Sequence, residues 1–200
     1  MDLREFLGTL LRHWLTIVLC IVVAMVASIG VTLLMTPQYK SSSVLYVMAR
    51  TPGAQGTSDV LQGSNYARQA VLSYVQVIGD AIVLDPVIAR LGLDMTAAEL
   101  SSHVTATSPT NTVIINITAT DDSPTLAADI ANAVAQSLAT VIMDELEKTS
   151  ADTTELVKVT QTQQAIVPTS PSSPNLVLNL AIGLVAGLAL GIGLAWLRSV

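Results

Sequence analysis

The side chains that most often carry chemistry in proteins are sparse in this sequence. Its two histidines, His13 and His103, lie far apart, and its one cysteine, Cys20, lies within an apolar run. A lone cysteine excludes an internal disulfide and a cysteine-rich zinc site. Asp121 and Asp122 have no further carboxylates at a metal-ligand spacing, and capping of a following helix accounts for both. We therefore predict no metal site, no cofactor site and no catalytic residue.

The motifs and the composition argue against a Walker-type kinase, a nucleic-acid partner and a site for a flat cofactor. The sequence contains no G-x-x-x-x-G-K-[ST] loop, so it lacks the phosphate cradle of a Walker-type kinase. Nine Lys and Arg residues oppose fifteen Asp and Glu residues, and the net charge of −6 disfavours nucleic acid as a partner. Aromatic residues make up 4% of the chain, too few for a platform that stacks bases or flat cofactors. We predict that this chain is not an enzyme.

Small residues recur at helical spacing in one apolar segment. Gly183, Gly187 and Gly191 repeat every fourth residue, and such a ridge lets another helix approach closely within a membrane. We predict transmembrane packing at these three glycines. Self-association of the chain through the ridge is one interpretation, and the general abundance of small residues in membrane helices is the other.

Prolines precede this glycine-containing segment. Pro168, Pro171 and Pro174 repeat every third residue, a pattern that favours an extended left-handed conformation without internal hydrogen bonds. We predict that residues 168–175 form a stiff connector whose prolines fix the entry of the following helix. A proline-rich peptide ligand for an aromatic groove is the alternative interpretation.

The composition requires that part of this chain lies in lipid. Hydrophobic residues make up 51% of it and charged residues 12%, whereas about a quarter of residues are charged in soluble domains. Two runs without formal charge, 15–35 and 176–197, are each long enough for the roughly 20 helical residues that cross a bilayer. We predict two transmembrane helices there. A cleaved signal peptide ending near Gly30 is the alternative for the first run, although its apolar residues continue to Met35.

Tryptophan and arginine mark one end of each apolar run. Trp14 lies next to the first run with Arg12 beyond it, and Trp196 lies at the end of the second run with Arg198 beyond it. Indole rings favour the headgroup boundary, and basic residues favour the cytoplasmic side. The predicted organisation is a cytoplasmic segment at 1–14, spans at 15–35 and 176–197, an extracytoplasmic domain at 37–167, a proline-rich connector at 168–175 and a cytoplasmic end at 198–200.

The middle segment predicts one compact α/β domain with a mixed sheet. A Thr96–Glu99 capping box and a Pro124 helix start give two of its helix boundaries. The run from 60 to 91 predicts two consecutive helices, broken near Gly79 and again at Pro86. Its terminal strands continue into the two apolar helices. The predicted order is β-α-α-α-β-β-α-β, with strands at 41–50, 104–107, 112–120 and 155–160 and helices within 60–91, 96–103 and 124–148.

Several separated segments together resemble a known family. An apolar run closes on Thr36-Pro37-Gln38-Tyr39, and Asn111–Ile117 (NTVIINI) and Asp121–Ala133 (DDSPTLAADIANA) follow before the spaced prolines and the glycine-rich span. In this order they resemble the Wzz-type chain-length determinants, the polysaccharide co-polymerases. The resemblance implies a membrane-proximal α/β domain between two transmembrane helices, assembled into a ring-like homo-oligomer in the bacterial plasma membrane.

The same resemblance implies a function and partners. The function would be non-catalytic regulation of the chain length or export of a cell-surface polysaccharide, such as a capsule, an exopolysaccharide or an O-antigen. The implied partners are further copies of the chain, a polysaccharide polymerase, a bacterial tyrosine kinase, the growing glycan and membrane lipid.

The predicted domain has no room for the long protruding helix of the enterobacterial proteins. The chain is therefore more similar to the short adaptors of Gram-positive bacteria that pair with a tyrosine kinase. In those adaptors a cytoplasmic tail after the second span contacts the kinase, and here only residues 198–200 follow. We expect either a separately encoded kinase that is contacted little or a longer polypeptide of which this is the membrane part.

A second hypothesis is an extracytoplasmic sensor or transmembrane adaptor that activates a cytoplasmic tyrosine kinase. A sensor requires a ligand pocket in the middle domain. Tyr66, Arg68 and Tyr74 are the one cluster in the sequence suited to line such a pocket. Packing on a helix surface explains the same three residues equally well.

Overall fold

The computed structural model describes residues 13–49, 57–146 and 157–197. The chain divides into two compact units. One unit combines Met1–Pro37 with Ser172–Val200, and the other is Gln38–Pro171. The first unit carries the apolar helices and the second carries the sheet.

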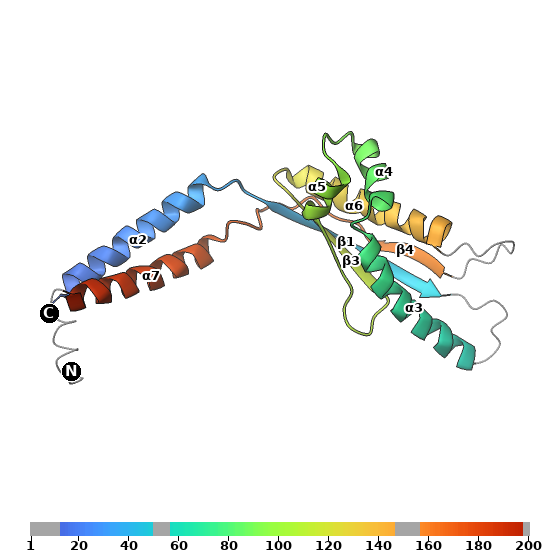
Figure 1. Ribbon diagram of the computed structural model, residues 1–200, viewed down its shortest axis with the longest axis horizontal. Helices are drawn as coiled ribbons and strands as arrows, with labels where there is room; N and C mark the ends of the chain where they lie inside the picture. Colours follow the sequence, from blue (N-terminus) through green and yellow to red (C-terminus); the bar gives the residue numbers. More distant parts are fainter. Residues whose placement is uncertain (1–12, 50–56, 147–156, 198–200) are drawn as a thin grey trace. The chain divides into compact units, whose positions relative to one another are not determined.

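Two long helices form the described core of the first unit. α2 spans Trp14–Leu34 and α7 spans Leu176–Leu197. They lie side by side and run in opposite directions (Figure 1). Both are long and apolar enough to cross a membrane. Most of their large apolar side chains are exposed on the outside of the pair, as expected for helices that face lipid.

A third helix, α6, together with the turn that follows it, is also long and apolar enough to cross a membrane. It spans Pro124–Val141 and is followed by a π-helical turn, η1, at Ile142–Leu146. Nine of its residues are buried, and they pack against the sheet and a neighbouring helix of the second unit. We therefore regard α6 as a core helix of the domain, because its apolar side chains already have protein partners.

The domain contains a four-stranded sheet in the order β2-β3-β1-β4. All three pairs are antiparallel, so the α/β class is confirmed while the pairing differs from the predicted mixed sheet. Helical connections lead from β1 to β2 and from β3 to β4. The two strands of each of these pairs run in the same direction, but one antiparallel strand lies between them in the sheet. The strand bounds are Tyr39–Ala49 for β1, Val104–Thr107 for β2, Ile114–Asp121 for β3 and Val157–Gln163 for β4.

Helices cover one face of this sheet (Figure 1). Alternate strand residues such as Leu45, Ile117 and Val159 point into the core, where they meet apolar side chains of the helices. Tyr46 and Met48 point to the opposite face and are exposed. The helices of this layer, besides α6, are α3 at Thr57–Val77, α4 at Ala81–Leu91 and α5 at Ala97–His103.

The predicted helix starts are confirmed at the level of single hydrogen bonds. The Thr96 hydroxyl accepts from the Glu99 amide at 3.3 Å, and a carboxylate oxygen of Glu99 accepts from the Thr96 amide at 2.7 Å. This hydrogen bond from the Thr96 backbone lowers the pKa of Glu99. At α6 the Ser123 hydroxyl accepts from the Leu126 amide, and Pro124 occupies the first turn.

The break near Gly79 is confirmed, but the predicted break at Pro86 is wrong. α4 continues through Pro86. A proline at this position removes a single helical hydrogen bond, and its ring lies on the exposed side of the helix. Buried residues on both sides of it, among them Val83 and Val87, hold the helix to the core. The predicted ends at 50, 148 and 155 lie outside the described residues.

Candidate functional site

The predicted glycines lie on the side of α7 that faces α2. An added Cβ atom would clash with α2 at each of them: 2.9 Å from Ser28 Cβ at Gly183, 2.7 Å from Ile21 Cα at Gly187 and 2.9 Å from Ile17 Cα at Gly191. At Gly193 such a Cβ would meet no described atom within 4 Å outside the adjacent backbone of its own helix. The structure therefore brings the three glycines together at a helix contact within one chain. Self-association of copies through them stays a prediction.

Three polar side chains join the same two helices, and we call them the polar clamp: Ser28 and Thr32 on α2 and Asn179 on α7. The side-chain amide of Asn179 donates to the Thr32 hydroxyl at 2.9 Å, and the Ser28 hydroxyl donates to the backbone carbonyl of Asn179 at 2.7 Å. The Thr32 hydroxyl donates in turn to the Ser28 carbonyl at 2.8 Å. Polar side chains that pair in this way hold apolar helices in one register.

The polar clamp is not among the residues predicted from the sequence. Its members stand within apolar runs, near the end of the first run and near the start of the second. In a hairpin of two antiparallel helices these two positions face each other. A search for matched polar residues in the two runs would have found Thr32 and Asn179.

A second polar cluster lies where β4 ends, and we call it the polar seam. It consists of Ser41 and Ser43 on β1, Asn132 on α6 and Gln161 on β4. Both serines are buried, and they continue the core-facing side of β1. Polar residues at two core positions of a strand are the sequence signal that could have indicated this cluster.

The predicted prolines lie in the irregular segment between β4 and α7. Pro168 and Pro171 belong to the domain, and Pro174 belongs to the unit of apolar helices. α7 begins at Leu176, directly after the predicted connector. The side chain of Asn175 caps this helix, since its Oδ1 accepts from the Val177 amide at 3.1 Å. The role of the prolines in fixing the helix entry stays a prediction.

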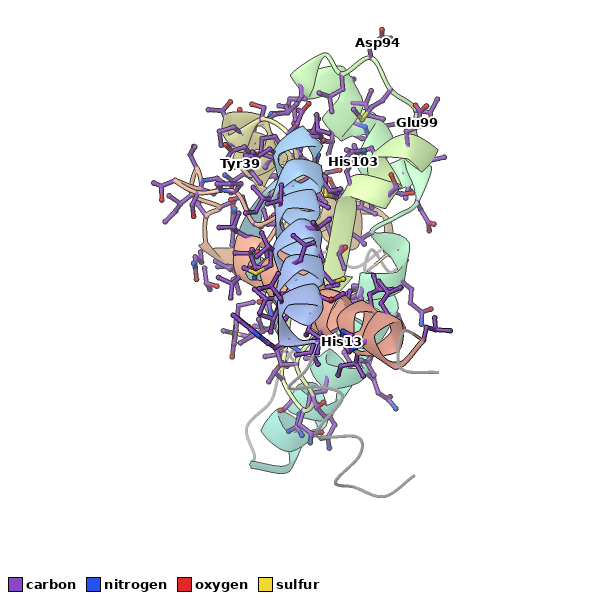
Figure 2. All side chains as sticks on the ribbon, turned by 90° about the vertical axis from the view of Figure 1, so that its left-hand side faces the viewer. His13, Tyr39, Asp94, Glu99 and His103 are labelled. Atoms are coloured by element: carbon purple, nitrogen blue, oxygen red, sulfur yellow. The ribbon has the colours of Figure 1, made fainter. Side chains whose placement is uncertain are left out.

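Asp121 and His103 lie close to the start of α6. Asp121 Oδ1 accepts from the Ser123 amide at 2.8 Å, and the ring nitrogen Nδ1 of His103 lies 3.0 Å from the Thr120 carbonyl oxygen. Burial raises the pKa of Asp121. Figure 2 shows His103 and Glu99, which both belong to α5. Within the described ranges there is no group of three or more His, Cys, Asp or Glu side chains that could hold a metal ion.

The side chains suggested for a sensor pocket do not form one. Tyr66, Arg68 and Tyr74 all lie on α3. Tyr74 is buried in the domain core, Tyr66 is exposed, and the Arg68 guanidinium donates to the Ser64 hydroxyl at 3.1 Å. A shallow groove of about 280 Å³ lies elsewhere, between α4 and α6. None of the residues predicted for a site lines that groove.

Comparison with known proteins assigns the chain to a family. The Wzz family model, described as chain length determinant protein, matches residues 1–91. The probable capsular polysaccharide biosynthesis protein YwqC of Bacillus subtilis is 31% identical over 198 residues, which cover 98% of this chain and 76% of YwqC. The chain belongs to the Wzz chain-length determinant family. The resemblance seen in the sequence is thereby confirmed.

Further relatives of this Wzz chain carry related names. The capsular polysaccharide biosynthesis protein CpsC of Streptococcus pneumoniae is 29% identical over 190 residues, which cover 93% of this chain and 77% of CpsC. CpsC of Streptococcus agalactiae is 28% identical over 158 residues, which cover 78% of this chain and 64% of CpsC.

A solved structure shares the fold of this Wzz chain. It is a full-length bacterial polysaccharide co-polymerase with a TM-score of 0.55 and 11% sequence identity, covering 99% of this chain and 97% of the other. At this identity the likeness concerns the fold alone. An α/β domain flanked by N-terminal and C-terminal apolar helices is common to both.

Proposed function

We propose that this chain is a non-catalytic membrane protein that regulates the chain length of a cell-surface polysaccharide of the capsular type. The observation that carries the proposal is the match to YwqC, a probable capsular polysaccharide biosynthesis protein, along 98% of the chain. The architecture supports it, because two apolar helices able to cross a membrane flank one compact domain.

The proposed location is the bacterial plasma membrane, with α2 and α7 as spans and both termini in the cytoplasm. The sequence supports this orientation, because Arg12 precedes the first span and Arg198 follows the second, and basic residues next to spans favour the cytoplasmic side. The domain between the spans is then extracytoplasmic. In that position it reaches a glycan that is being assembled or exported at the outer face of the membrane.

The proposed mechanism depends on geometry and involves no bond chemistry by this chain. Several copies form a ring-like homo-oligomer and place their domains around or beside a polysaccharide polymerase, so that the growing glycan stays engaged for a limited time. A separately encoded bacterial tyrosine kinase acts on the cytoplasmic side as a further partner. An α/β domain tied to a hairpin of two spans supports such a role, because it gives each copy a defined anchor.

The experiment that tests this function is deletion of the gene, followed by complementation with the full chain. The surface polysaccharide of each strain is extracted and its size distribution is measured by gel electrophoresis and light scattering. We expect deletion to abolish the preferred chain length and complementation to restore it. A size distribution that is the same in the deletion strain and the parent would refute the proposal.

The ring-like assembly has its own test. The protein is extracted in native nanodiscs, and its mass is measured by native mass spectrometry. We expect a closed oligomer of many copies. A monomer or dimer under these conditions would exclude the ring and favour a role as an adaptor for the kinase.

A further inference from the structure

The chain leaves the domain through residues 164–167, which follow the last strand. The backbone pairing of β1 with β4 reaches Val44 opposite Gln163, and its register shifts between Val44 and Leu45. Two of the residues beyond this point, Ile166 and Val167, expose 74% and 46% of their surface. Burial of large apolar side chains therefore does not hold the exit segment against the domain.

Asn132 holds this segment by pairing with both backbone groups of one residue. Its Oδ1 accepts from the Ala165 amide at 2.8 Å, and its Nδ2 donates to the Ala165 carbonyl at 3.0 Å. A side-chain amide has the same donor and acceptor as a peptide group. Asn132 on α6 thus provides the hydrogen bonds that a neighbouring strand would provide if the sheet continued.

The rest of the polar seam fixes Asn132 and the exit segment. Gln161 Nε2 donates to Asn132 Oδ1 at 2.9 Å and to the Ser43 hydroxyl at 2.8 Å. The Ser43 hydroxyl donates to the Gln163 carbonyl at 3.0 Å. The Ser41 hydroxyl donates to the Ile166 carbonyl at 2.7 Å. Three elements, α6, β1 and β4, therefore contribute to one network around the exit.

The entry and the exit of the domain are held in different ways. The chain enters through β1, whose first residue, Tyr39, is already paired with Asp121 of β3. The Ser41 to Ile166 hydrogen bond shows that the exit runs next to this entry. Strand pairing therefore secures the entry, whereas side-chain hydrogen bonds secure the exit.

We propose that Asn132 is a positioning residue that fixes the place and direction in which the chain leaves the domain toward the connector at 168–175, and that chain-length control requires this fixed exit. The inference rests on the proposed function. Proline restricts φ and donates no hydrogen bond, so the direction set at Ala165 passes into the segment that contains Pro168 and Pro171. Loss of the Asn132 contacts releases the exit from α6 without removing an apolar side chain from the core.

The test uses the full-length protein in its host and in nanodiscs, with two variants that release the exit from different elements. Asn132→Ala removes the contacts from α6, and Ser41→Ala removes the contact from β1. Thr140→Ala is the matched control on α6, because its hydroxyl donates to the Gln136 carbonyl of its own helix. Val87→Ala is the control for stability, because it opens a cavity in α4, which contributes no residue to the polar seam.

Two readouts are compared. In Asn132→Ala we expect at least tenfold faster hydrogen exchange of the Ala165 amide, which donates to Asn132, as measured by mass spectrometry of the peptide that covers 161–167. We expect Asn132→Ala and Ser41→Ala to shift or broaden the size distribution of the polysaccharide at equal protein levels. Thr140→Ala and Val87→Ala should leave that distribution unchanged, even where Val87→Ala lowers the melting temperature more.

Three results would overturn the inference. Unchanged exchange in 161–167 shows that Asn132 does not hold the exit, and faster exchange with an unchanged polysaccharide shows that a fixed exit is not required. The same change of the polysaccharide size distribution in Val87→Ala shows that lost stability is the cause. Gene deletion separates the two proposals: a deletion without effect overturns the proposed function as well, whereas an effective deletion with an ineffective Asn132→Ala overturns the inference alone.

Discussion

Replacement of Gly187 by alanine should separate α2 from α7. The added Cβ would lie 2.7 Å from Ile21 Cα, whereas carbon atoms in contact lie about 3.5 to 4.0 Å apart. A backbone atom cannot move aside like the end of a side chain, so the helices must part locally by about 1 Å to restore that spacing. Overpacking of this kind costs about 1 to 3 kcal/mol. Gly187→Ala should therefore be less stable by this amount than a glycine-to-alanine change on the same helix whose added Cβ meets no neighbour.

Gly193→Ala is the matched control, because at this position an added Cβ meets no described atom of the other helix within 4 Å. Alanine is the better helix former by about 1 kcal/mol, a gain common to both variants. The difference between them therefore isolates the steric cost at Gly187.

The assay is unfolding of the helix pair by sodium dodecyl sulfate in mild detergent micelles. Energy transfer is followed between dyes at cysteines introduced for Leu15 and Leu194, both exposed, in a Cys20→Ser background. The unfolding free energies of Gly187→Ala and Gly193→Ala are then compared. Equal values within about 0.5 kcal/mol, less than the smallest expected steric cost, would refute the assignment of the glycines to the contact between α2 and α7.

Three further perturbations have defined outcomes. Burial raises the pKa of Asp121, so the folded chain keeps the carboxyl proton to higher pH than the unfolded chain does. The domain therefore loses stability as the pH rises from about 4 through the raised pKa. Asp121→Asn keeps an acceptor for the Ser123 amide and should flatten this loss of stability in melting curves recorded between pH 4 and 7. Thr96→Ala removes a helix cap and should cost about 1 kcal/mol in chemical denaturation of the domain. Asn179→Leu removes the hydrogen bond to Thr32 and should weaken the helix pair by about 0.6 kcal/mol in the same detergent titration.

Features of the fold that depend on local patterns could be predicted from the sequence. The element order of the domain, the capping box at Thr96 and the start of α6 at Pro124 are confirmed. Each depends on residues close together in the chain, where periodicity and capping chemistry decide the outcome. The Wzz family could also be recognised from the sequence, because its motifs are short local segments that keep their order along the chain.

Features that depend on residues far apart in the chain could not be predicted. The insertion of β3 between β1 and β2 leaves no periodic trace in any one strand, so the antiparallel pairing was missed. The contacts of Asn132 with Ala165 join residues 33 positions apart. The prediction at Pro86 failed because tertiary packing of Val83 and Val87 outweighs one missing helical hydrogen bond.

The side-by-side entry and exit of the domain also bear on protein engineering. The chain ends of the domain meet at Ser41 and Ile166, and the helix ends that receive them meet at Thr32 and Asn179. Each unit thus presents a closely spaced pair of termini, as is typical of domains that tolerate insertion. The α/β domain is thus inserted, as one continuous segment, between the two helices of a hairpin. This spacing of the termini predicts that a larger or smaller domain, or a short linker, can replace it without redesign of the hairpin.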